Sequence, residues 1–332
     1  MKNRRLEYGI SDRPPFRRLL TLALQQMMAI LTGTIALPML LGHGVEPAAA
    51  MFGAGAGTIL YLLLTGFKSP MFLSSSFTFL GPMMAAFAGG ASVELGMLGL
   101  IIGAGVAGLV YVVLSVVVKV VGVGWVERLI PPVVSGPAIA VIGLSLAGNA
   151  ISNMRTGDVM LSMETGGTAA AASEYVTLFC GFVTLVVTII CSVYGKNILK
   201  LIPFLMGMVA GYVVAAASTL TGSLADMDML KITDFGVFTR MMFPEGTFSL
   251  SSLIRVPDFV FIKAIRGVRE LSLSYVITIV TAYTPVALAA FAEHIGDHKN
   301  LSSIAGQDIL SDPGLHRTLL GDGLGSFESV VG

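Results

Sequence analysis

The chain has 332 residues, of which 12% are charged and 55% are hydrophobic, and its mean hydropathy is +0.84. A soluble domain carries about twice that charged fraction, so the composition excludes an ordinary soluble protein and a disordered chain. Lysine plus arginine and aspartate plus glutamate balance at 20 each, which excludes a basic nucleic-acid-binding protein. The 39 glycines suit closely packed membrane helices. The sequence therefore predicts an all-α polytopic membrane protein.

Residues 1–18 are basic and polar and contain no signal-peptide cleavage site, which predicts a cytoplasmic N-terminal tail. No charged or Gly/Ser-rich linker divides residues 19–332, so we predict a single membrane transporter domain. A spanning helix needs about 20 apolar residues. Nine stretches approach that length: 19–41, 48–66, 71–90, 95–118, 129–148, 174–194, 199–220, 273–296 and a weaker one at 315–332.

Lysine and arginine predict the orientation, because cytoplasmic loops are enriched in both. With the N-terminus inside, 13 of the 20 basic residues fall in cytoplasmic segments and seven fall outside. The long segment 222–270 is basic although it is assigned to the outside, but long loops follow the rule poorly. Its prolines and aromatic residues favour a position partly along the membrane interface. Residues 149–172 read as a solvated external loop.

The third predicted span contains the clearest break in a helical pattern. Proline follows Ser69 and precedes Met83, and three serines stand together at 74–76. Proline and serine disfavour a continuous helix, which predicts an extended stretch leading into a half-helix near Ser76, beside the ring of Phe77. Interrupted helices are where transporters commonly build their binding sites. The alternative is a serine-rich helix that packs against its neighbours.

Polar side chains also stand inside the first span, where Gln25 and Gln26 precede Gly33. Two amides in an apolar helix need hydrogen-bond partners, so both are expected to face the protein interior. They serve either as interhelical contacts or as part of a site.

Glu293 is the most informative acidic residue. It follows a long apolar run, and Asp297 lies four residues later, so on a helix the two carboxyl groups share one face. Two acidic groups in a poorly solvated place are typical of a proton carrier. The alternative is that the helix leaves the membrane here and that residues 293–299 form its solvated end.

Other patterns argue against enzymatic chemistry. Cys180 and Cys191 are about three helical turns apart, too far for a disulfide, and read as core residues. The four histidines show no metal-binding spacing. Residues 143–147 lack the final glycine of a nucleophile elbow, and the glycine run 53–57 fits tight helix packing rather than phosphate binding. We predict a protein that is not an enzyme and that needs no cofactor other than a proton as coupling ion.

Several of these segments, in this order, resemble the nucleobase–ascorbate transporter family and within it the bacterial uracil permeases. The matching motifs cover nearly the whole chain, and the last two are specific to this group. They are residues 33–38 (GTIALP), 52–58 (FGAGAGT), 75–79 (SSFTF), 124–127 (GWVE) with Pro131 and Pro132, 140–144 (AVIGL), 293–297 (EHIGD) and 312–317 (DPGLHR).

The resemblance implies a fold of fourteen helices in two inverted repeats of seven, with a broken third span and a helix that continues past the glutamate. It implies proton-coupled uptake of uracil across the cytoplasmic membrane. By matching position, Glu293, Phe77, Ser76 and Gly33 bind the substrate. Glu293 and Asp297 carry the proton, and Gln25 and Gln26 belong to a polar network. The implied partners are uracil and the lipid bilayer, with a homodimer as a candidate assembly.

The sequence departs from the family pattern in three places. Asp297 stands where a well-known uracil permease has histidine, and Gln26 stands where many members have histidine in a Gln-His pair. The chain ends at Gly332, where the family continues into an Asn-Thr-Thr-Tyr-Gly-Glu motif, which implies a chain ending after the ninth span. Glu328 is not assigned the role of the second carboxylate in that motif.

Two other functions stay open at this stage. A xanthine or urate permease would use similar scaffolding with a wider pocket. An anion exchanger of the same fold would need a cation facing the half-helices, and no lysine or arginine stands in the middle of a predicted span.

Overall fold

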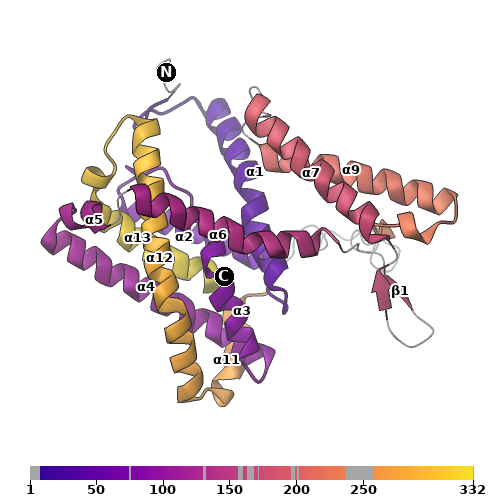
Figure 1. Cartoon of the computed structure of the whole chain (residues 1–332). Coiled ribbons are helices and arrows are strands. Elements are labelled where there is room, and N and C mark those ends of the chain that lie inside the picture. The colour runs from indigo at the N-terminus through magenta and orange to yellow at the C-terminus, as the bar shows by residue number, and fades with distance from the viewer. Residues whose placement is uncertain are drawn as a thin grey trace. The chain divides into compact units, whose positions relative to one another are not determined.

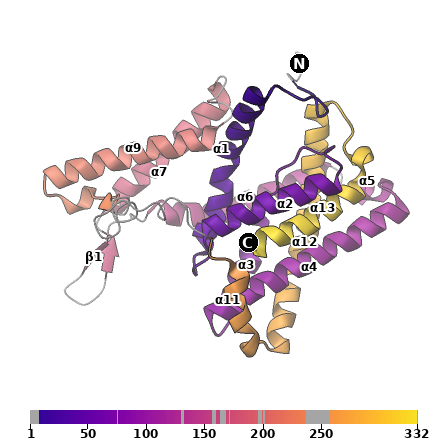
Figure 2. The same ribbon diagram turned by 180° about the vertical axis from the view of Figure 1, so that it is seen from behind.

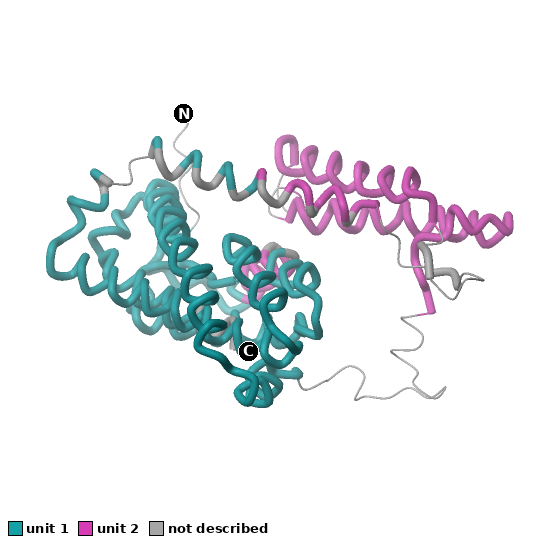
Figure 3. Tube along the Cα trace, turned by 60° about the horizontal axis from the view of Figure 1, so that its bottom comes forward, with its two compact units in different colours: residues 1–19, 33–143, 257–332 teal, residues 20–32, 144–256 magenta. Residues whose placement is uncertain are grey.

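The computed structural model divides into two compact units, which are coloured separately in Figure 3. The first unit comprises residues 1–19, 33–143 and 257–332, and the second comprises residues 20–32 and 144–256. The structure describes residues 8–74, 76–129, 132–155, 160–162, 168–170, 172–195, 199, 202–236 and 257–331.

The first unit is built from helices (Figure 1). Helices α1 (Phe16–Leu41) and α6 (Pro132–Asn153) contribute residues to both units. The other elements of the first unit are α2 (Pro47–Leu64), η1 (Phe77–Phe79), α3 (Leu80–Ala88), α4 (Val93–Val121), α5 (Gly124–Leu129), α11 (Val260–Gly267), η5 (Val268–Glu270), α12 (Leu273–Ala305), η6 (Leu310–Gly314) and α13 (Leu315–Val331).

The predicted all-helical membrane architecture is confirmed. Among the described residues, six helices are long and apolar enough to cross a membrane, by length and composition: α1, α2, α4, α7, α9 and α12. Helices α3, α6 and α13 coincide with the three remaining stretches that the sequence pattern indicated.

The third span is interrupted as predicted. Residues 70–74 and Ser76 have no helical structure, and Ser76 itself is extended, with φ −86° and ψ 122°. A short 3₁₀ turn begins at Phe77 and leads directly into α3, so that the second half of the span is a half-helix. Ser75 lies outside the described residues. The alternative of a continuous serine-rich helix is therefore wrong.

Helix α12 continues well past Glu293. Its N-cap Ser272 accepts a hydrogen bond from the N–H of Tyr275, and it ends at Gly306, whose φ of 67° suits glycine. Its 33 residues correspond to about 50 Å, which exceeds a hydrocarbon core of about 30 Å. The helix therefore does not end at Glu293, and the alternative of a solvated helix end there is wrong.

Glycines allow α13 to pack closely against α2 and α4, and Figures 1 and 2 show the three helices together. A Cβ atom on Gly57 of α2 would collide with the carbonyl of Gly325 in α13. A Cβ atom on Gly108 of α4 would meet the carbonyl of Gly323. Gly57, the last glycine of the run 53–57, therefore serves helix packing, as predicted for this run.

The second unit contains two long helices, α7 (Glu174–Tyr194) and α9 (Pro203–Leu224), and a short η2 (Asp228–Leu230). A Cβ atom on Gly207 or Gly211 would collide with a threonine of α7, so these glycines allow the helices to pack closely. Cys180 and Cys191 are buried free thiols, as predicted. The loop predicted at 149–172 contains two strands, β1 (Met160–Ser162) and β2 (Thr168–Ala170), which pair antiparallel.

Candidate functional site

A cavity of about 300 Å³ lies in the first unit at the break in the third span. The extended segment and the start of the half-helix form one wall, and α4, α12 and α13 form the rest. It is lined by Met71, Phe72, Leu73, Ser74, Ser76, Phe77, Thr78, Phe79, Ala107, Gly108, Tyr111, Ala290, Glu293, His294, Asp297, Asp322 and Gly323.

Glu293 connects α12 to the half-helix. Its Oε2 accepts a hydrogen bond of 2.7 Å from the hydroxyl of Thr78, which lies in the first turn after the break. Within the described residues no hydrogen bond occupies Oε1, so one carboxylate oxygen is available to a ligand. Asp297 lies one turn further along α12 and lines the same cavity. The predicted common face of the two carboxyl groups is confirmed.

The half-helix brings Phe77 and Ser76 to the cavity wall. Ser76 makes no side-chain cap at the N-terminus of the 3₁₀ turn. The first N–H groups of a helix have no partner within it, so the amides at Phe77 and Thr78 have no acceptor inside the turn. The residues at the start of the half-helix and Glu293 therefore line one cavity.

Three predicted site residues do not line this cavity. Gly33 is absent from its wall, although the hydroxyl of the adjacent Thr34 lies 3.0 Å from the hydroxyl of Ser74, which does line it. Gln25 is half-buried and Gln26 is exposed, and both belong to the second unit. The role of the two glutamines in a polar network and that of Gly33 in substrate binding stay predictions.

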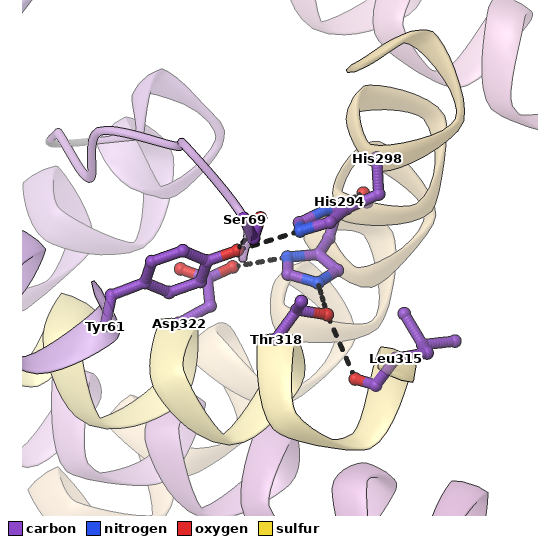
Figure 4. A network of polar contacts seen from close by, with 7 residues as sticks. All are labelled: Tyr61, Ser69, His294, His298, Leu315, Thr318 and Asp322. Carbon is purple, nitrogen blue, oxygen red and sulfur yellow. Dashed lines mark hydrogen bonds and ion pairs between the residues drawn. The ribbon is translucent and has the colours of Figure 1, made fainter. Parts of the chain in front are cut away.

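A buried polar network adjoins the cavity, and sequence reasoning missed it (Figure 4). His294 Nδ1 lies 2.7 Å from Oδ2 of Asp322 in α13, and both residues line the cavity. The other ring nitrogen lies 3.2 Å from the hydroxyl of Thr318, which donates to the carbonyl of Leu315. The side chain of His294 is 3% exposed and that of Asp322 is 18% exposed, so this ion-pair contact is shielded from solvent.

The network extends away from the cavity through His298. Its Nε2 lies 2.9 Å from the hydroxyl of Tyr61 in α2, which in turn lies 2.7 Å from the hydroxyl of Ser69. Its Nδ1 lies 2.8 Å from the carbonyl of His294. The two histidines are four residues apart on α12, and their ring centroids are 4.0 Å apart. That spacing was the available signal, because it predicts a common helix face.

One hydroxyl holds the extended segment against α2. The N–H of Leu73 donates to Oγ1 of Thr58 at 3.0 Å, and the same hydroxyl lies 3.3 Å from the carbonyl of Leu73. The one proton of this hydroxyl donates mainly to the carbonyl of Ala54 at 2.6 Å, so Thr58 acts chiefly as the acceptor for the Leu73 N–H, which a buried backbone needs in place of a neighbouring strand. The part of the cavity wall at Leu73 is thereby held against α2.

Comparison with known proteins agrees with this arrangement. The profile of a family described as the permease family matches residues 17–331. The chain is 36% identical over 323 residues to the uracil permease of Bacillus caldolyticus, covering 97% of this chain and 64% of the relative. It is 32% identical over 337 residues to the uracil permease of Bacillus subtilis (strain 168), covering 100% of this chain and 67% of the relative. It is also 32% identical over 321 residues to the uracil permease of Escherichia coli (strain K12), covering 97% of this chain and 63% of the relative.

The chain thus spans about two thirds of the length of these relatives. The match extends from the first helix to the last, and it includes every element that lines the cavity. The chain is therefore an integral membrane protein that belongs to the permease family, the nucleobase–ascorbate transporters that its motifs indicated.

Proposed function

We propose that the protein carrying this sequence takes up uracil across the cytoplasmic membrane, driven by protons. The family is one of permeases, and several relatives that cover nearly the whole chain are named uracil permeases. A permease family also argues for a transporter rather than an enzyme. The cavity volume of about 300 Å³ lies at the small end of the range for small-molecule sites, about 300–1,000 Å³, which suits a single-ring base.

The observation that carries the proposal is the position of Glu293 opposite the start of the half-helix. Uracil offers two N–H donors and two carbonyl acceptors. The carboxylate of Glu293 accepts from a ring N–H, and the amides at Phe77 and Thr78 donate to a carbonyl. The ring of Phe77 and the side chain of Ser76 complete the wall around the base.

Proton coupling rests on Glu293 and Asp297 together. Both carboxyl groups line the cavity, so a substrate that binds there contacts them in either their protonated or their charged form. Protonation of this pair removes negative charge from the cavity, and the gradient biases that step toward uptake. No group other than the proton is needed for this cycle.

Replacing Glu293 with glutamine tests the site. Glutamine keeps the shape but loses the charge, so uracil affinity is expected to fall by about 10- to 150-fold, the equivalent of about 1.5–3 kcal/mol for a charged hydrogen bond. Calorimetry on the purified protein measures the change. Glu174→Gln in α7 is the matched control, because Glu174 is exposed, pairs with Arg155 and lies in the other unit. An affinity for uracil within twofold of the unmodified protein would remove Glu293 from the site.

We also infer a cytoplasmic N-terminus from the distribution of lysine and arginine. A cysteine replacing Thr156, which lies outside the described residues, should react with an impermeant thiol reagent added to intact cells. A cysteine replacing Lys299 should react only after the membrane is opened. Background labelling should be low because both native cysteines are buried. The reverse pattern would show that the orientation is inverted.

A further inference from the structure

Helix α11 (Val260–Gly267) buries only one of its sides. Its buried residues are Val260, Ala264 and Gly267, which share one face. Gly267 lies so close to the backbone of Glu94 and Leu95 that a Cβ atom would not fit. Helix α11 is thereby held against the start of α4.

A second side of α11 is apolar and exposed. Phe261 is 40% exposed and Ile265, four residues later, is 67% exposed, and Ile262 beside them is 53% exposed. The ring of Phe261 stacks on that of Phe259 at 5.5 Å, which extends the apolar surface. Water is a poor solvent for such a surface.

A third side of α11 is basic. Lys263 and Arg266 are three residues apart and share a face, and Arg269 follows in η5. The ammonium of Lys263 is engaged by Asp258 at 2.6 Å. Arg266 and Arg269 are exposed, and among the described residues neither has an ion-pair partner. The nearby Glu270 accepts a hydrogen bond of 2.6 Å from Ser92. Two exposed cationic side chains are therefore available on this side of α11.

The contact between Ser92 and Glu270 also shows at which depth of the bilayer α11 lies. Ser92 caps the start of α4, and Glu270 lies three residues before the start of α12. Both helices are membrane spans, so their starts lie at one surface of the bilayer, and α11 packs against α4 there (Figures 1 and 2).

We propose that α11 lies in the membrane interface and binds anionic lipid. Its apolar side, Phe261, Ile262 and Ile265, contacts the upper acyl chains. Arg266 and Arg269 contact lipid phosphates. An apolar stripe beside a basic stripe is the pattern of interfacial helices. A basic residue near an anionic surface changes the local lipid preference by about fivefold.

Fluorescence quenching by brominated lipids tests the proposal on the reconstituted chain. Ile265→Trp is introduced together with Trp125→Phe, which removes the single native tryptophan. The indole N–H of Trp125 has no hydrogen-bond partner in the described structure, so that change sacrifices no such bond. Vesicles contain phosphatidylcholine and phosphatidylglycerol, and one of the two carries the bromine.

Brominated phosphatidylglycerol is expected to quench position 265 about fivefold or more in preference to brominated phosphatidylcholine. Bromine near the headgroup should quench more than bromine deep in the chain. Arg266→Gln with Arg269→Gln should abolish the preference, and Arg266→Lys with Arg269→Lys should keep it. Leu109→Trp is the matched control, because Leu109 is 63% exposed on α4, ten residues from the basic Lys119, and should show no preference.

Equal quenching by both lipids, or a preference that survives the two glutamine substitutions, would overturn the binding of anionic lipid. Absence of quenching by either lipid, together with disulfide cross-linking of Ile265→Cys between two copies, would overturn the proposal. It would show that the apolar side of α11 contacts a second copy of the chain.

Discussion

Asp322→Ala is expected to lower the free energy of unfolding by about 3–5 kcal/mol, because it removes one partner of a buried ion-pair contact. The imidazole of His294 would then keep one polar nitrogen without its partner in a shielded place. Thr318 holds only the other nitrogen, so it cannot compensate (Figure 4). Thermal unfolding of the purified protein in detergent measures the loss.

An exposed ion pair provides the matched control for Asp322. Lys68 and Asp312 meet at 2.7 Å, but their side chains are 54% and 68% exposed, against 3% and 18% for His294 and Asp322. Asp312→Ala should therefore cost only about 0–1 kcal/mol. The double substitution of His294 and Asp322 should cost less than the two single losses added together. Equal destabilisation by Asp322→Ala and Asp312→Ala would contradict the claim that burial makes the His294–Asp322 contact the more important of the two for stability.

Gly57→Val is expected to destabilise the protein by about 3 kcal/mol or more, at the upper end of the range for overpacking. A Cβ atom at this position meets backbone of α13 at Gly325, and a backbone carbonyl cannot turn aside as a flexible side chain can. The helices would have to separate along their whole contact. The measurement is the fraction of monodisperse protein after heating, followed by size-exclusion chromatography.

Gly55→Val is the matched control, since Gly55 belongs to the same helix but a Cβ atom there has nothing within 4 Å. It should not lower the thermal midpoint, because the added side chain meets no neighbour and valine has a higher helix propensity than glycine. The change in helix propensity is the same in both variants, so a difference between them reports the collision with α13. If the two variants unfold at the same temperature, Gly57 is not required for the close packing of α2 against α13.

The broken third span could be predicted because its cause is local. Proline at positions 70 and 82 and the serines at 74–76 oppose a helix whatever surrounds them, so the break lies where the sequence indicated. The continuation of the helix past Glu293 could not be predicted from the neighbouring residues alone. Charged residues near position 293 fit a helix end and a buried site equally well, and only the packing of α12 against α4 and α13 separates the two.

The partner of His294 could not be predicted for a related reason. Asp322 lies 28 residues later, beyond a turn whose geometry no local pattern fixes. Thr78 and Glu293 are separated by 215 residues, and nothing in either neighbourhood indicates that one hydroxyl meets that carboxylate. The environment of Gln25 and Gln26 could not be predicted either, because an amide in an apolar helix can find a hydrogen-bond partner in several ways.

The hydroxyl of Thr58 links a residue outside the cavity to one of the residues that line it. Thr58 does not line the cavity, yet it anchors Leu73, which does. Any change that moves α2 by a fraction of an ångström shifts the extended segment with it, and the volume of the cavity shifts too. If the cavity holds a base as proposed, substitutions in α2 that never contact that base can change the selectivity between small and large bases.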